Sequence, residues 1–164
     1  MVGATGILRP AVASLVAAGR PVVAVARTRA SLDELAGPLV TGLAADRAAL
    51  PDPGGLVAGC SAALVYAPAL DDPSVPAVAA AIPGTVVHVV TSAVATPRFP
   101  DEPWDPGELT SSPLENVVRL VLGWTRPGRW HTPEEVSAAA LGTLDRRRDC
   151  VLGVLRPWSD RPLH

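Results

Sequence analysis

The chain contains no lysine, and Tyr66 is the single tyrosine among its 164 residues. A reaction mechanism that needs a tyrosine paired with a lysine is therefore excluded. Cysteine is also scarce, because the sequence has only Cys60 and Cys150, far apart and without a nearby histidine pair. This pattern predicts neither a disulfide framework nor a metal site, and two buried apolar thiols are expected.

Charge is sparse, since 18% of the residues are charged and the formal net charge is −2. The one basic cluster, Arg146–Arg148, is interpreted as a solvated helix end, so no nucleic-acid partner is expected. The uncharged apolar stretch Leu56–Leu70 is about 15 residues long, shorter than the roughly 20 of a membrane-spanning helix. The beginning of the chain also lacks the pattern of a secretory signal. The sequence therefore predicts a cytoplasmic protein with no membrane partner.

Apolar residues are abundant, at 48% with a mean hydropathy of +0.28, and 164 residues suit one domain covering 1–164. The patterns predict strands over 21–26, 39–45, 62–67, 85–91, 116–122 and 150–155, and helices over 7–18, 31–36, 74–82 and 133–144. Strands alternate with helices, which predicts an α/β fold with a doubly wound, mostly parallel sheet. The proline-rich segment 94–114 is expected to be a long loop that covers a ligand.

Helix boundaries are also marked in the sequence. Ser31 is predicted to cap the second helix, and Gly19 to end the first. Thr132 and Glu135 form a capping box, with Pro133 at the first position of the last helix.

Two glycines, Gly3 and Gly6, lie immediately before the first predicted helix. Gly3 allows a tight turn, and Gly6 lets the backbone approach a pyrophosphate held by free N–H groups and the positive end of the helix dipole. The turn, helix and buried strand follow in the order of a mononucleotide-binding unit. The sequence thus predicts a Rossmann-like dinucleotide site that includes Gly3, Thr5, Gly6, Ile7 and Leu8.

The strand that follows this helix ends in Ala26-Arg27-Thr28-Arg29, where an acidic residue would favour NAD. A guanidinium group instead suits a 2′-phosphate, because its paired donors match phosphate oxygens. NADP(H) is therefore favoured over NAD(H), with Arg27, Thr28 and Arg29 as binding residues. The alternative is that both arginines are solvated loop residues.

Two features depart from the usual pattern of such a unit. Arg9 stands where a third glycine is expected, so it points away from the strand or reaches a phosphate. Only Met1 and Val2 precede Gly3, although the first strand normally supplies about 5–6 residues to the middle of the sheet. The first strand is thus interpreted as truncated, with a natural start upstream as the hypothesis and another segment in the gap as the alternative.

Several segments resemble small atypical short-chain dehydrogenase/reductases, which are NAD(P)-binding Rossmann proteins. The resemblance is carried by Gly3-Ala4-Thr5-Gly6-Ile7-Leu8, Val87–Ser92, Leu122-Gly123-Trp124 with Arg129–Glu135, and Val151–Val154 with Pro157-Trp158 and Arg161-Pro162. It implies that Asp46 lies near the adenine, that Tyr66, Ala67 and Pro68 lie beside the cofactor, and that Ser92 lies near the nicotinamide. The main family's Tyr-x-x-x-Lys relay has no counterpart here.

Ser92 and Tyr66 are the candidate catalytic residues. Ser92 ends a strand where open parallel sheets bind ligands, and its hydroxyl can polarise a carbonyl or imine, although capping the next turn is the alternative. Tyr66 closes over the nicotinamide or donates a proton, unless it is a packed aromatic. His88 is expected to be a buried imidazole rather than a general acid. His131 and the acidic residues around Trp104 are interpreted as surface groups.

The leading hypothesis is an NADP(H)-dependent oxidoreductase that acts on a small carbonyl or imine substrate. A homodimer is compatible with so small a sheet. One alternative is a non-catalytic dinucleotide-binding sensor or subunit, which the missing proton relay favours. The other is a Rossmann fold reused for a non-redox isomerisation or cyclisation.

Overall fold

The computed structural model describes residues 1–46, 55, 57, 59–97, 105, 107, 109 and 112–162. Most of the predicted 94–114 loop, including Trp104, lies outside these residues. Strands and helices alternate along the described chain, as the sequence predicted. The described strands are β1 (Val22–Ala26), β2 (Val40–Ala44), β3 (Ala63–Tyr66), β4 (Val86–Thr91), β5 (Val117–Leu122) and β6 (Cys150–Leu152).

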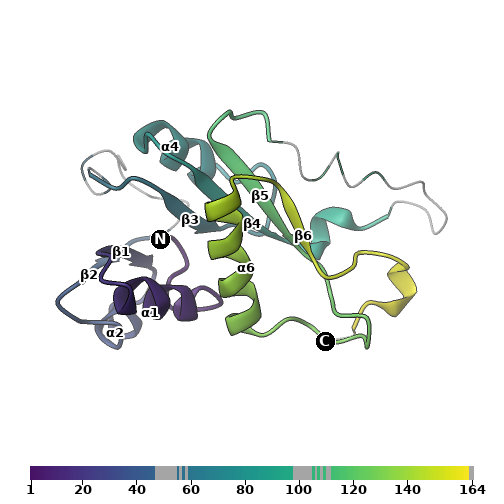
Figure 1. Ribbon diagram of the computed structural model, residues 1–164, viewed down its shortest axis with the longest axis horizontal. Coiled ribbons are helices and arrows are strands. Elements are labelled where there is room, and N and C mark those ends of the chain that lie inside the picture. The colour runs from purple at the N-terminus through teal and green to yellow at the C-terminus, as the bar shows by residue number, and fades with distance from the viewer. Residues whose placement is uncertain are drawn as a thin grey trace.

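The strands form a parallel sheet in two stretches, β1–β2 and β3–β4–β5–β6 (Figure 1). Val2 joins the stretches, because it forms parallel bridges to both Val25 and Val65. The predicted doubly wound Rossmann-like sheet is therefore confirmed. Before Gly3, the described chain contributes to this sheet through the bridges of Val2.

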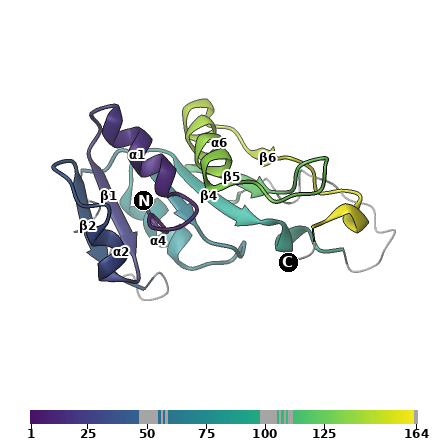
Figure 2. The ribbon, with the colours of Figure 1, turned by 90° about the horizontal axis from the view of Figure 1, so that it is seen from below.

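Helices cover both faces of the sheet. The elements α1 (Arg9–Ala17) and α6 (Pro133–Arg146) pack together on one face, and α4 (Ser74–Ala81) lies on the other (Figure 2). Leu8, Val87 and Leu120 belong to the core beneath α6, whereas Val65 and Val86 belong to the core beneath α4. Apolar residues cover the inner strands β1, β3, β4 and β5 on both sides, which explains their continuous β-rich runs in the sequence.

The ends of α1 and α6 follow the sequence signals. Gly19 has a φ of 71°, and its N–H donates to the carbonyl of Val16, so it ends α1 as predicted. The capping box of Thr132 and Glu135 is present at the start of α6. Both helices are therefore confirmed, with α6 continuing slightly beyond its predicted end.

Three predictions of local structure were wrong. The helix α2 (Arg29–Asp33) begins after Thr28, so Ser31 lies inside it and does not cap it. The strand β6 ends at Leu152, because Gly153 turns the chain with a φ of 82° and Val154 pairs antiparallel with Trp124. The two thiols are half-buried rather than buried.

Two short 3-10 helices complete the described elements, η2 (Ser92–Ala95) and η3 (Trp158–Asp160). The segment η2 follows the carboxyl end of β4, and η3 lies in the C-terminal segment. No helix among the described residues is long and apolar enough to cross a membrane.

Candidate functional site

The turn between Val2 and α1 depends on Gly3. This residue has a φ of 80°, which favours glycine, and its N–H donates to the Val25 carbonyl over 3.0 Å. A Cβ at this position would lie 3.0 Å from the Cβ of Tyr66, which is closer than nearly all real contacts. Gly3 therefore lets the turn pass tightly between the ends of β1 and β3.

Gly6, unlike Gly3, faces open space, because a Cβ built there meets no atom within 4 Å. The N–H groups of Thr5, Ile7 and Leu8 make no hydrogen bond with the described residues, as expected just before a helix. The free amides and the positive end of the α1 dipole favour an anion at this turn. The open side of Gly6 provides the space for it.

A cavity of about 360 Å³ lies at this turn and extends along the carboxyl ends of β1, β2 and β3. Its lining residues are Val2, Gly3, Thr5, Gly6, Ile7, Val25, Ala26, Arg27, Ala45, Asp46 and Tyr66. This is the edge of a parallel sheet at which ligands are expected. The cavity brings together residues from four separate segments of the chain.

The structure separates the three arginines near this edge. Arg27 lines the cavity, whereas the Arg29 Nε donates to the Asp33 carboxylate over 3.0 Å along the exposed side of α2. Arg9 forms an exposed ion pair with Glu34, at 2.8 Å, and so points away from the strand. Arg27 is thus the arginine that faces the cavity, and Arg29 already has a carboxylate partner.

The predicted cofactor residues fall into two groups. Gly3, Thr5, Gly6, Ile7, Arg27 and Asp46 line the cavity. Leu8, Thr28, Arg29, Ala67 and Pro68 do not, since Leu8 and Ala67 are fully buried and Thr28 precedes α2. The sequence reasoning missed Val2, Val25, Ala26 and Ala45, although their positions at predicted strand ends were a usable signal.

The two candidate catalytic residues lie on neighbouring strands. Tyr66 ends β3 and lines the cavity. Ser92 follows β4 as the first residue of η2, where it is buried and outside the cavity lining. Of the two candidate catalytic residues, only Tyr66 therefore lines this cavity.

His88 is buried within β4, as predicted, and its Nε2 lies 2.9 Å from the Ala67 carbonyl oxygen. Burial is the largest cause that lowers the pKa of His88 below its ordinary value, with the Ala67 hydrogen bond opposing it. A carbonyl oxygen can only accept, so Nε2 carries the proton in this contact. His88 thus holds the chain after β3 at the edge of the site.

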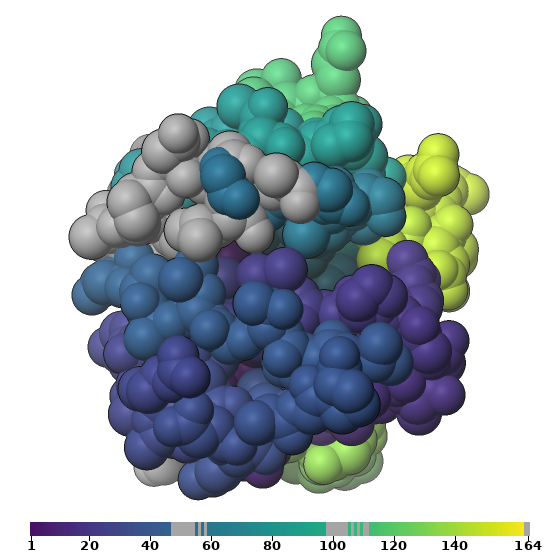
Figure 3. All heavy atoms as spheres, turned by 90° about the vertical axis from the view of Figure 1, so that its left-hand side faces the viewer, coloured from purple at the N-terminus to yellow at the C-terminus, as the bar shows by residue number. Residues whose placement is uncertain are grey.

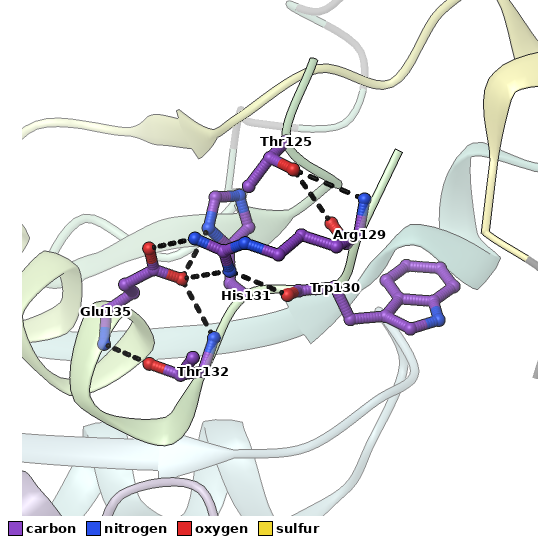
Figure 4. A network of polar contacts seen from close by, with 6 residues as sticks. All are labelled: Thr125, Arg129, Trp130, His131, Thr132 and Glu135. Atoms are coloured by element: carbon purple, nitrogen blue, oxygen red, sulfur yellow. Dashed lines mark hydrogen bonds and ion pairs between the residues drawn. The ribbon is translucent and has the colours of Figure 1, made fainter. Parts of the chain in front are cut away.

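The segment before α6 forms a polar network at its N-terminus (Figure 4). The Arg129 guanidinium donates to both carboxylate oxygens of Glu135, over 2.6 and 2.8 Å, and the Thr132 N–H donates to the same carboxylate. The His131 ring lies 3.3 Å from Glu135 and is largely buried. Arg129, His131 and Thr132 thus all contact the Glu135 carboxylate. His131 was predicted to be a surface group, whereas its ring is packed within this network.

Glu135 is expected to stabilise the fold in a pH-dependent way. Hydrogen bonds from Arg129, and secondarily from Thr132, lower the pKa of Glu135 to about 2. A depressed carboxyl pKa contributes stability above the unfolded value of about 4.3, and this stability is lost as the pH falls toward 2. The variant Glu135→Gln should therefore melt at a lower temperature than the parent at pH 7, and the gap should shrink between about pH 4.3 and 2.

The neighbouring Glu134→Gln is the matched control, because Glu134 is exposed and lies outside the network. Thermal melts of the parent and of both variants, at pH 7 and at pH values falling from about 4.3 toward 2, measure the effect. Equal melting temperatures for the two variants at pH 7 would contradict the stabilising role of Glu135.

The fold is that of the short-chain dehydrogenase/reductase structures, a Rossmann-type fold. A protein assigned as a betaketoacyl-ACP reductase superposes with a TM-score of 0.68 and 18% identity, over 93% of each chain. A protein assigned as a short-chain dehydrogenase/reductase family oxidoreductase, from Aeromonas hydrophila subsp. hydrophila, superposes with a TM-score of 0.60 and 20% identity. The match covers 93% of this chain and 96% of that one. A protein assigned as a short-chain dehydrogenase, from Novosphingobium aromaticivorans, superposes with a TM-score of 0.62 and 16% identity. The match covers 95% of this chain and 79% of that one. No family model and no curated protein sequence matches the chain.

Proposed function

We propose that the chain binds NADP(H) in the cavity at the Gly3–Gly6 turn and is an oxidoreductase for a small carbonyl or imine substrate. The observation that carries the proposal is the joint placement of Gly6 and Arg27 on this cavity. The open side of Gly6 accommodates a pyrophosphate next to free amides, and the Arg27 guanidinium suits a 2′-phosphate. The likeness to reductase and dehydrogenase structures supports a nicotinamide dinucleotide as the ligand.

The residues of the chain fit this ligand class. Thr5 and Ile7 contribute free amides at the start of α1, and Asp46 lies in the cavity at the end of β2. A bound nicotinamide would supply or accept a hydride. The chain itself would position the ring and provide the proton that a reduced carbonyl requires.

Tyr66 is the proton donor that we propose for this role. It lines the cavity, and the chain has no lysine to form the usual pair with it. Ser92 is the second candidate, because a hydroxyl at the end of β4 could polarise a carbonyl, but it would have to become exposed to the cavity to do so. The assignment requires a substrate that binds at the carboxyl ends of β3 and β4.

Calorimetric titration with NADPH and NADH separately tests the cofactor site. The variant Arg27→Ala should weaken NADPH binding by about 10- to 100-fold, because charge-assisted hydrogen bonds contribute roughly 1.5–3 kcal/mol. NADH binding should change little, since NADH has no 2′-phosphate. Arg29→Ala is the matched control, because Arg29 is on the same turn but pairs with Asp33.

Two results would contradict this proposal. If Arg29→Ala weakened NADPH binding as much as Arg27→Ala, the 2′-phosphate would not be bound specifically by the arginine that lines the cavity. If neither nucleotide bound to the parent protein, the redox interpretation would be abandoned.

A non-catalytic dinucleotide sensor is the second candidate, favoured by the absence of lysine. NADPH oxidation in the presence of a panel of carbonyl and imine compounds separates the two. Turnover that is lost in Tyr66→Phe supports the enzyme, whereas tight NADPH binding without turnover supports the sensor.

A further inference from the structure

The helices α1 and α6 lie side by side on one face of the sheet. Both begin at its carboxyl edge, since α1 follows the glycine turn and α6 connects the parallel strands β5 and β6. The beginnings of the two helices share one apolar core, to which Leu8, Ala11, Val136 and Ala140 belong. In Figure 3 the purple atoms of the early residues meet yellow-green atoms of the late residues. The beginning of α6 is thus packed against the turn that lines the proposed cofactor cavity.

A buried polar contact joins α6 to this turn. Ser137 is 2% exposed, and its hydroxyl donates to the Ile7 carbonyl over 3.0 Å. The two residues are 130 positions apart in the chain. A serine inside a helix often donates to the carbonyl one turn earlier in its own helix. The contact with Ile7 is therefore a product of the tertiary structure and links α6 directly to the proposed site.

The Ile7 carbonyl lies just ahead of the hydrogen-bonded ladder of α1. The N–H groups of Ala11 and Val12 both donate to the Leu8 carbonyl, and no backbone N–H of the described residues donates to Ile7. Ser137 is thus the donor that this carbonyl has in the described part of the chain. Anchoring the carbonyl restricts the backbone dihedrals at Ile7, and it therefore holds this residue in one orientation.

Ile7 also presents one of the free amides of the cavity, since it lines the cavity and its N–H has no acceptor among the described residues. Leu8, the N-cap of α1, makes no side-chain hydrogen bond to the amides of this helix. The beginning of α6 differs, because the Thr132 hydroxyl accepts from the Glu135 N–H. The beginning of α1 is thus open to an external anion, while Ser137 fixes the carbonyl side of the same residue.

We propose that Ser137 is a positioning residue of the dinucleotide site. Its hydroxyl holds the Ile7 carbonyl and so keeps the Ile7 N–H directed at the pyrophosphate. This inference rests on the proposed function, because it requires a dinucleotide phosphate at the glycine turn. Ser137 itself touches no ligand and acts through Ile7. The pyrophosphate is common to NADPH and NADH, so its effect should be the same for both, unlike that of Arg27.

The variant Ser137→Ala tests the proposal. We expect its affinity for NADPH and for NADH to fall by the same factor, roughly 3- to 10-fold, as for the loss of one hydrogen bond. Thr143→Val is the matched control, because the Thr143 hydroxyl is buried on the same helix and makes no hydrogen bond with the described residues. Its affinities should equal those of the parent. Calorimetric titration of all three proteins measures the factors.

Amide spectra separate a positioning role from a general loss of stability. On saturation with NADH, the Ile7 amide signal should shift in the parent and in Thr143→Val, and it should shift less in Ser137→Ala. Ser137→Cys keeps the size of the side chain with a weaker donor, so its affinity should fall between those of the parent and the alanine variant. The cysteine variant carries the test if Ser137→Ala does not fold.

Unchanged affinities in Ser137→Ala would overturn this inference and leave the proposed function in place. A loss for NADPH alone would also overturn it, because the effect would then lie at the 2′-phosphate. An equal loss in Thr143→Val would show that the two hydroxyls act only through the stability of α6. Failure of the parent to bind either nucleotide would instead contradict the proposed function itself, and the role of Ser137 with it.

Discussion

Replacing Gly6 with valine is expected to weaken NADPH binding by at least about 100-fold while the melting temperature of the unliganded protein stays nearly unchanged. Binding is expected to be lost without a loss of stability because a Cβ at Gly6 meets no protein atom within 4 Å. The added side chain therefore enters only the space proposed for the pyrophosphate. A lost close approach of backbone to phosphate removes several hydrogen bonds at once. Calorimetric titration and a thermal melt of the same sample measure both quantities.

Gly3→Val is the contrasting variant. Its side chain would meet the Cβ of Tyr66, and valine disfavours the φ of 80°. It should therefore lower the melting temperature as well as the affinity. If Gly6→Val bound NADPH like the parent, the cavity at this turn would not be the dinucleotide site.

Replacing Trp124 with alanine is expected to destabilise the fold by about 3–5 kcal/mol, the largest loss among our predictions. Trp124 is fully buried, and its ring makes edge-to-face contacts with Trp130 and Trp158 at centroid distances of 6.3 and 5.7 Å. Its backbone also pairs with Val154. Removal leaves a cavity between the end of β5 and the C-terminal segment, and chemical denaturation measures the cost.

Trp158→Ala is the matched control, because Trp158 belongs to the same cluster but is only half-buried. The Arg161 guanidinium stacks over Trp158 at 5.1 Å and over Trp130 at 5.2 Å, so part of this cluster survives without Trp158. A loss for Trp124→Ala no larger than that for Trp158→Ala would show that the buried ring is not the centre of the cluster.

Local signals predicted much of the fold. Apolar runs located each described strand within a few residues, because strands covered on both faces need continuous β-rich sequence. Ser31 shows the weakness of such signals, since Thr28 begins α2 instead. A serine in a polar stretch fits several cap positions, and contacts of Leu32 with the core decide the register of the helix.

The candidate site was only partly predictable. The glycine turn was visible because the two glycines are followed by a helix and a buried strand in the order of a mononucleotide-binding unit, and Gly6 does face open space. The difference between Arg27 and Arg29 was not visible, because it depends on Asp33 accepting from Arg29 one helical turn later. Burial of Ser92 away from the cavity lining likewise follows from the packing of η2.

The sequence by itself determined the order of strands and helices, the tight turn at Gly3, the cap of α6 and the absence of a Tyr/Lys pair. These features depend on residues that are neighbours in the chain, so local sterics and hydrogen bonding are sufficient to specify them. Only the tertiary structure decided which arginine lines the cavity and which of the two candidate catalytic residues does so. Each of these depends on contacts between segments that are distant in the chain, and no local pattern encodes their distances.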